Sequence, residues 1–185
     1  MQAPKPGWRV LDVGCGTGIV AREVAVRLGA NGTVTGLDLN PNMLTVARAV
    51  ANREGLAIGW RKGNAEQLPF PHSSFDLVLC QFALMFVPNK VVALAEMHRV
   101  LSKNGRVLFS VWQTIDRHPF YQTLHKVIQQ RLGMSALQDI FSLGSSAALR
   151  ALTTITTDMQ PHLRKITYEN HVVLPFHANI VRAWP

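Results

Sequence analysis

The sequence predicts an α/β domain whose sheet is mostly parallel and carries helices on both faces. Apolar segments of strand length alternate with segments of helical periodicity, and this order favours right-handed crossovers between parallel strands. Of the 185 residues, 48% are hydrophobic and 16% are charged, a balance that suits a sheet covered on both sides. A chain of this length can bury a large core, so residues 1–185 are expected to form one domain.

The first predicted strand, Val10–Val13, ends in a glycine-rich turn. Gly14, Gly16 and Gly18 leave the backbone without Cβ atoms where a helix begins, so a ligand can approach the main chain closely. Dinucleotide-binding folds have a third glycine at the position of Ile19, and this chain does not. The turn therefore predicts a ligand site of a different kind, although a tight turn without a ligand would use the same residues.

A ribose-binding acid follows at a suitable distance. A helix is expected from about Thr17 to Leu28, where Gly29 ends it, and the next apolar run is Gly32–Leu39. Asp38 closes this run, twenty residues after the last glycine of the turn. A carboxylate at this position can accept hydrogen bonds from both hydroxyls of a ribose.

The next elements place further polar groups near the same edge. Asn40 is a suitable N-cap for a helix from Pro41 to about Glu54, with Met43 in its first turn. The short run Ile58–Lys62 is expected to be an edge strand, and a polar loop, Gly63–Phe70, follows it.

Two more strands are expected on the other side of the first one. The buried strand Phe75–Phe82 carries Gln81 at its carboxyl end, the side on which open α/β sheets bind ligands. A helix from Asn89 to Leu101 and a turn at Asn104-Gly105 lead into a fifth strand, Arg106–Trp112.

The remainder is expected to hold helices and one more strand. A helical pattern covers His118–Gly133, and Ser145 or Ser146 can cap another helix through Leu152. A sixth strand is expected at Lys165–Leu174, and the last residues, Asn179–Trp184, are interpreted as the start of a helix.

Several of these segments resemble class I S-adenosylmethionine-dependent methyltransferases. The glycine turn and Asp38 match the first motif and the acidic loop of that family. The loop Gly63–Phe70, which reads Gly-Asn-Ala-Glu-Gln-Leu-Pro-Phe, is similar to its usual Gly-Asp-Ala-x-x-Leu-Pro-Phe. The run Glu96–Val107 is similar to E-M-x-R-V-L-x-P-G-G-R in methyltransferases akin to the ubiquinone and menaquinone C-methyltransferases. Ser110–Trp112 resembles a subgroup whose members mostly lack an assigned substrate.

The resemblance implies a Rossmann-like fold and S-adenosylmethionine as the cofactor. It assigns residues 1–112 to a cofactor half, residues 113–160 to a substrate-side helical insertion, and residues 164–176 to the sixth strand. Asn64 stands where the family has an acid that binds the adenine amino group, and its carbonyl oxygen can accept the same hydrogen bond. The candidate cofactor-binding residues are Asp12, Gly14, Cys15, Gly16, Gly18, Asp38, Leu39, Met43, Asn64, Ala65 and Gln81.

No catalytic residue is assigned. Displacement at a sulfonium methyl group needs little acid catalysis, so a methyltransferase need not contain a triad. His118, Tyr121 and His125 are the ionisable side chains expected near the crevice, but a histidine on a helix is more often a surface or core residue. Cys15 and Cys80, the only cysteines, lack metal-ligand spacing, so no metal site is expected and a reduced, cytoplasmic setting is favoured.

Three functions compete at this point. The leading one is methyl transfer to a small-molecule acceptor. The net charge of +8 motivates an RNA or protein methyltransferase instead, and a domain that binds the cofactor without catalysis is the third. The basic residues are scattered, and Gln81 begins the run Gln-Phe-Ala-Leu where an Asn-Pro-Pro-Tyr-type strand end would stand, so nucleic acid is not expected as a partner. No segment is apolar enough to predict a membrane span.

The resemblance also predicts an incomplete sheet. The family orders its strands 3-2-1-4-5-7-6, and the chain reaches Pro185 soon after the sixth strand, so the fold is expected to lack the seventh. Arg106–Trp112 would then have an unpaired edge, which Lys165–Leu174 or a second copy of the chain would cover. A homodimer through the edge of the fifth and sixth strands is the expected assembly.

Overall fold

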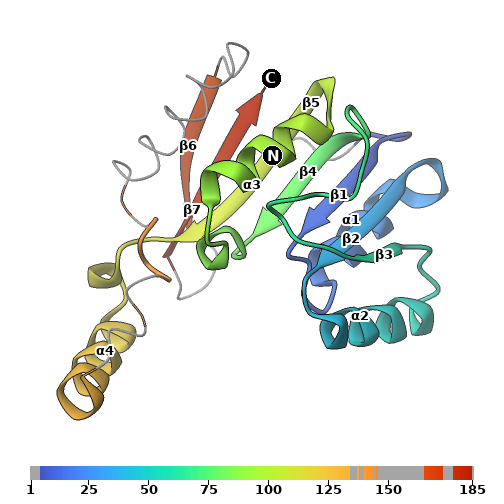
Figure 1. The fold of residues 1–185 in the computed structure, drawn as a ribbon. Helices are drawn as coiled ribbons and strands as arrows, with labels where there is room; N and C mark the ends of the chain where they lie inside the picture. Colours follow the sequence, from blue (N-terminus) through green and yellow to red (C-terminus); the bar gives the residue numbers. More distant parts are fainter. Residues whose placement is uncertain are drawn as a thin grey trace.

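The chain forms a seven-stranded sheet with helices on both faces (Figure 1). The computed structural model describes residues 5–133, 137, 140–143 and 145, together with the backbone of residues 165–172 and 177–184. The strand order is β3-β2-β1-β4-β5-β7-β6, in which β1 to β5 are parallel and β7 is antiparallel to both of its neighbours. The strands are β1 Arg9–Val13, β2 Thr33–Asp38, β3 Gly59–Lys62, β4 Phe75–Gln81, β5 Leu101–Trp112, β6 Lys165–Val172 and β7 His177–Trp184.

Helices begin and end close to the predicted residues. The α-helices are α1 Ile19–Leu28, α2 Pro41–Arg53, α3 Lys90–Val100 and α4 Pro119–Leu132. The side chains of Asn40 and Asn89 cap α2 and α3 by accepting backbone N–H groups, as their residue types predict. Helix α1 starts at Ile19 and not at Thr17, because Gly18 has a left-handed backbone with φ of 79°.

The parallel half of the sheet is covered on both sides. On one face, α3 packs over β4 and β5, and its Met97 and Val100 are fully buried against residues such as Val78 and Phe109 (Figure 1). On the other face, α1 buries Ala21, Val24 and Leu28 against Val10, Val34 and Leu79 in a second cluster. Alternate residues of each central strand thus contribute to different cores, which explains why these strands are apolar throughout.

The prediction of a missing seventh strand is wrong. His177–Trp184 forms β7, which pairs with β5 over Val107–Trp112 and with β6 along its whole length. The six residues Asn179–Trp184, interpreted above as the start of a helix, are part of this strand. The local pattern of these residues carries no sign of the pairing, which satisfies the backbone groups of β5 that would otherwise form an open edge.

This strand changes the expectations that depended on an open edge. Because β7 covers β5, the described part of the predicted sixth strand, Lys165–Val172, does not lie beside β5; it forms β6, at the edge of the sheet. The homodimer stays a prediction that no longer has an unpaired β5 to support it. The predicted turn at Asn104-Gly105 lies inside β5, where the pairing with β4 shifts from Phe75↔Leu101 to Leu77↔Arg106. The helix expected from Ser145 or Ser146 to Leu152 lies outside the described residues, apart from Ser145 itself.

Among the described residues, no helix combines the length and apolar character needed to cross a bilayer. The same residues contain no cluster of three or more histidine, cysteine, aspartate or glutamate side chains suited to a metal ion.

Candidate functional site

The loops after β1, β2 and β3 are joined at the carboxyl edge of the sheet. The amides of Gly14 and Cys15 donate to the carbonyl oxygen of Leu37 at 2.8 and 3.0 Å. The amide of Gly63, which follows β3, donates to the carbonyl oxygen of Asp38 at 3.1 Å. These bonds bring the glycine turn, the acidic residue and the polar loop to one place, as the order of parallel strands predicts.

Asp38 is the central polar group of this edge. Its Oδ2 accepts the amide of Gly16 at 2.8 Å, and its Oδ1 accepts the amide of Asn40 at 2.8 Å. A carboxylate offers about four lone-pair sites, so two remain for a ligand. The loop amides thus orient the carboxylate, and the carboxylate can still bind the hydroxyls of a ribose.

The glycines of the turn differ in what surrounds them. A Cβ on Gly14 would lie 2.3 Å from Cβ of Ala83, and a Cβ on Gly18 would lie 2.4 Å from the ring of Trp60. A Cβ on Gly16 would meet no atom within 4 Å. Gly14 and Gly18 are therefore required by packing, whereas Gly16 adjoins open space beside Asp38.

Asp12 lies beneath the turn and is 1% exposed. A backbone hydrogen bond from Ala21 reaches its carboxyl group, and its Oδ2 has no hydrogen-bond partner among the described residues. Burial, and secondarily the negative charge of Asp38, raises the pKa of Asp12 to about 7. Burial likewise raises the pKa of the Cys15 thiol and raises that of Cys80 to about 12, so neither cysteine is a thiolate nucleophile at neutral pH.

Asn64 is exposed and belongs to a short turn. Its Oδ1 accepts the amide of Glu66 at 2.9 Å, and its Nδ2 donates to Oε2 of Glu66 at 3.3 Å. Two of the predicted site residues are exposed apolar side chains: Leu39 is 65% exposed and Met43 is 41% exposed. Such a mixture of exposed apolar and polar groups is typical of a small-molecule site.

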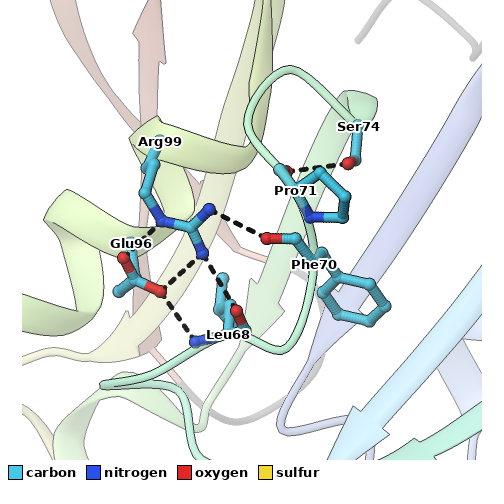
Figure 2. A network of polar contacts seen from close by, with 6 residues as sticks. All are labelled: Leu68, Phe70, Pro71, Ser74, Glu96 and Arg99. Carbon is cyan, nitrogen blue, oxygen red and sulfur yellow. Dashed lines mark hydrogen bonds and ion pairs between the residues drawn. The ribbon is translucent and has the colours of Figure 1, made fainter.

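A charged pair on α3 holds the loop that carries Asn64 (Figure 2). The guanidinium of Arg99 binds Glu96 at 2.6 and 2.8 Å and donates to the carbonyl oxygens of Phe70 and Leu68 at 2.8 and 2.9 Å. Glu96 in turn accepts the amide of Leu68 at 2.8 Å. The hydrogen bonds with Arg99 are the main reason why the pKa of Glu96 lies below its ordinary value.

Gln81 lies at the end of β4 on the side of α1. It lines a cavity of about 380 Å³ together with Ile19 and Ser110, which extends along the α1 face of the sheet to Trp8 and Arg106. The predicted place of Gln81 in the cofactor crevice stays a prediction. The next residue, Phe82, has a φ of 50° and stacks on Trp112 with ring centroids 4.4 Å apart.

The ionisable side chains predicted near the crevice gather at the end of β5. His118 is 4% exposed and packs edge-on against Trp112, while Tyr121 contacts Phe141 at 5.6 Å between ring centroids. His125 lines a different cavity with Thr114 and Gln129. These three residues thus belong to an aromatic cluster and its surroundings, and the geometry gives none of them a catalytic role.

Most of the predicted site residues come together, and several important residues were not predicted. The glycine turn, Asp12, Asp38 and the Asn64 loop are joined by the contacts above. The roles of Trp60 and Ala83 depend on contacts between distant parts of the chain and have no local signal. Glu66 does have a local signal, because Asn64 stands two residues before it and an asparagine side chain favours closing such a turn.

Comparisons with known proteins agree with this geometry. A family model described as a methyltransferase domain matches residues 11–109. The chain is 45% identical over 104 residues to the ubiquinone/menaquinone biosynthesis C-methyltransferase UbiE of Stenotrophomonas maltophilia. The aligned region covers 55% of this chain and 41% of that protein. The chain is 40% identical over 108 residues to the aklanonic acid methyltransferase DauC of a Streptomyces species, covering 58% of this chain and 49% of that protein. The matches therefore span less than half the length of either relative.

Solved structures show the same fold. A crystal structure of a SAM-dependent methyltransferase from Methanosarcina mazei aligns with a TM-score of 0.72 at 20% identity, over 98% of this chain and 94% of that one. The predicted Rossmann-like α/β architecture is confirmed by this likeness and by the strand order.

Proposed function

The chain belongs to the methyltransferase domain family, and we propose that it binds S-adenosylmethionine at the carboxyl edge of β1 to β4 and transfers the methyl group to a small organic acceptor. The observation that carries this proposal is the pairing of Asp38 with the open side of Gly16. The carboxylate is oriented by two backbone amides, and a Cβ built on Gly16, which supplies one of these amides, would have no atom of a more distant residue within 4 Å. That arrangement fits a ribose, whose hydroxyls would donate to Asp38.

The other predicted residues fit the remaining parts of the cofactor. Asn64 and the amide of Ala65 would bind adenine, and Gln81 would bind the methionine portion. Leu39 and Met43 supply exposed apolar surface for the adenine ring. Asp12, Gly14, Cys15 and Gly18 would form the floor of the site beneath the glycine turn.

S-adenosylmethionine, when bound, supplies a methyl group on a positively charged sulfur for in-line displacement by a nucleophile. The chain's own part is to hold the two reactants in line, which can supply several kcal/mol, and no general acid is required. A base is needed only where the acceptor arrives protonated.

The aromatic residues at the ends of β4 and β5 support an organic acceptor. Phe82, Trp112, Tyr121 and Phe141 form a continuous cluster there, next to the predicted methionine end of the site. We propose the same division of the domain as above, with residues 1–112 binding the cofactor and the following segment, which includes α4, lying on the acceptor side. The relatives' names describe acceptors of those proteins, and the acceptor of this chain is to be found by transfer of labelled methyl groups into metabolite extracts.

The cofactor assignment is tested by calorimetry on an Asp38→Ala variant. The variant loses up to two charge-assisted hydrogen bonds to the ribose, each worth about 1.5–3 kcal/mol, so affinity for S-adenosylmethionine should fall at least about tenfold. Asp116→Ala is the matched control, because Asp116 is exposed and its loss removes the same charge. Unchanged affinity in Asp38→Ala, or tighter binding of NAD than of S-adenosylmethionine by the wild type, would refute the assignment.

A further inference from the structure

The side chain of Glu66 fixes the orientation of the Asn64 amide. Asn64 accepts a hydrogen bond from the Glu66 backbone through Oδ1 and donates one to the Glu66 carboxylate through Nδ2. If the amide were turned by 180°, Nδ2 of Asn64 would face the backbone N–H of Glu66, and Oδ1 of Asn64 would face the Glu66 carboxylate. Both hydrogen bonds would be lost, so the oxygen and the nitrogen of Asn64 keep distinct positions.

Glu66 is itself held in place by α3. Its Oε1 accepts the amide of Asn89 at 2.6 Å, at the N-terminus of that helix. Asn89 caps the helix with its side chain, and the partial positive charge of a helix N-terminus favours a carboxylate at this position. One carboxylate thus connects a rigid helix to an exposed amide in the candidate site.

We propose that Glu66 is a positioning residue that presents the Asn64 oxygen to the ligand and so selects a base with an amino donor. This inference rests on the proposed function, in which Asn64 contacts adenine. After accepting the Glu66 amide, Oδ1 of Asn64 has one lone pair left, and the exocyclic amino group of adenine donates to it. A base with a 6-oxo group, such as hypoxanthine, places an acceptor against the same oxygen and is rejected.

The test compares S-adenosylhomocysteine with S-inosylhomocysteine by calorimetry; the second ligand has a 6-oxo group in place of the 6-amino group and carries a proton on the neighbouring N1. The wild type should bind the adenine compound at least about tenfold more tightly. In Glu66→Gln, one of the two terminal atoms becomes a donor, so the side chain can no longer accept from both Asn89 and Asn64. The preference should then fall below about threefold.

Glu96→Gln is the matched control, because it makes the same chemical change in the other anchor of this loop. It should weaken both ligands alike and leave their ratio unchanged. In an Asn64→Ala background, Glu66→Gln should have no further effect on the ratio.

The outcomes separate the two proposals. If the wild type binds neither compound, the proposed function fails and the inference fails with it. If the wild type binds S-adenosylhomocysteine but Glu66→Gln weakens both ligands equally, or leaves both unchanged, the cofactor assignment stands and the positioning role of Glu66 is wrong. If Glu66→Gln also changes the ratio of the two affinities in the Asn64→Ala background, the positioning role of Glu66 is wrong.

Discussion

The glycines in the turn after β1 are required for different physical reasons, and these reasons determine what each substitution should do. Gly14 has a φ of 68° and a neighbouring Cβ at 2.3 Å, whereas Gly16 has a φ of 53° and no atom within 4 Å of the position a Cβ would take. The two positions therefore share the backbone strain and differ in packing.

Alanine at these two positions should separate strain from packing. Gly16→Ala should cost about 1 kcal/mol of unfolding free energy for the left-handed backbone alone. Gly14→Ala should cost about 1–3 kcal/mol more, because its Cβ collides with Ala83. Urea denaturation measures both values, and adding Ala83→Gly to Gly14→Ala should recover most of the difference. Equal destabilisation by the two single variants would contradict the packing role of Gly14.

Asp12 should make the protein less stable as the pH rises. Its pKa is raised from 3.8 to about 7 in the folded protein, mainly by burial. Between these two values the unfolded chain releases a proton that the folded protein retains, so raising the pH favours unfolding. At 1.36 kcal/mol for each unit of pKa, the whole effect is about 4 kcal/mol.

The measurement compares the wild type with Asp12→Asn, which cannot ionise at this position. The unfolding free energy of the wild type, relative to the variant, should be about 2–3 kcal/mol lower at pH 8 than at pH 5. Taking the difference between the two proteins cancels the other titrating groups, including Asp76 and Glu96, whose pKa values lie below their ordinary range. Parallel pH profiles would show that Asp12 ionises as readily in the folded protein as in the unfolded chain.

At the scale of elements, α3 positions the loop between β3 and β4 through Arg99. Arg99→Met removes the donors to the carbonyl oxygens of Leu68 and Phe70 and leaves Glu96 without its cationic partner. The expected loss is about 2–4 kcal/mol of unfolding free energy, since hydrogen bonds from charged groups contribute about 1.5–3 kcal/mol each and this site is partly exposed. The amide of Leu68 should also exchange faster with solvent.

The control for this variant is Arg48→Met, because Arg48 is exposed on α2. A surface change of this kind should stay within about 0.5 kcal/mol of the wild type. If Arg99→Met is as mild as Arg48→Met, the network in Figure 2 does not anchor the loop.

The elements that could be predicted from the sequence are those with a strong local signal. The helices α2 and α3 have asparagine caps, and the parallel strands are continuous apolar runs, so their residues alone indicate them. Asp38 could be found because its distance from the glycine turn follows from one helix and one strand. Strand β7 could not be predicted in this way, because its pairing with β5 depends on residues about seventy positions away.

The same limit applies within the candidate site. Ala83 lies 69 residues after Gly14 in the chain, so their close approach has no local sequence signature. Exposed Asn64, by contrast, forms a turn with Glu66 that its residue type favours. Chemistry carried by neighbours in the chain was thus predictable, and chemistry carried by tertiary packing was not.

For the whole molecule, β7 completes a sheet in which both β1 and β5 are interior strands. The candidate cofactor residues lie at β1 to β4, and β5 joins this half to the antiparallel pair β7 and β6 (Figure 1). Amides of Val107–Trp112 should therefore exchange about as slowly as those of Val10–Val13, because each strand has a neighbour on both sides.

A proline in β7 tests whether this strand protects β5. Val181 pairs with Phe109 in the middle of the β5 and β7 ladder, and proline there removes an N–H group and disrupts the strand. Exchange of Val107–Trp112 amides in Val181→Pro should rise at least about tenfold, while Val10–Val13 amides and the affinity for S-adenosylmethionine change little.

His177→Pro is the control, since proline is tolerated at the first residue of a strand. Light scattering on the same samples shows whether β5 pairs with β7 of its own chain or with a second copy of the chain. In Val181→Pro, the exposed edge should drive association, and the variant should form dimers or larger species that the control does not. If the β5 amides exchange slowly in Val181→Pro and the variant stays monomeric, then β5 is stable without β7 beside it. The prediction that β7 protects β5 would then be wrong.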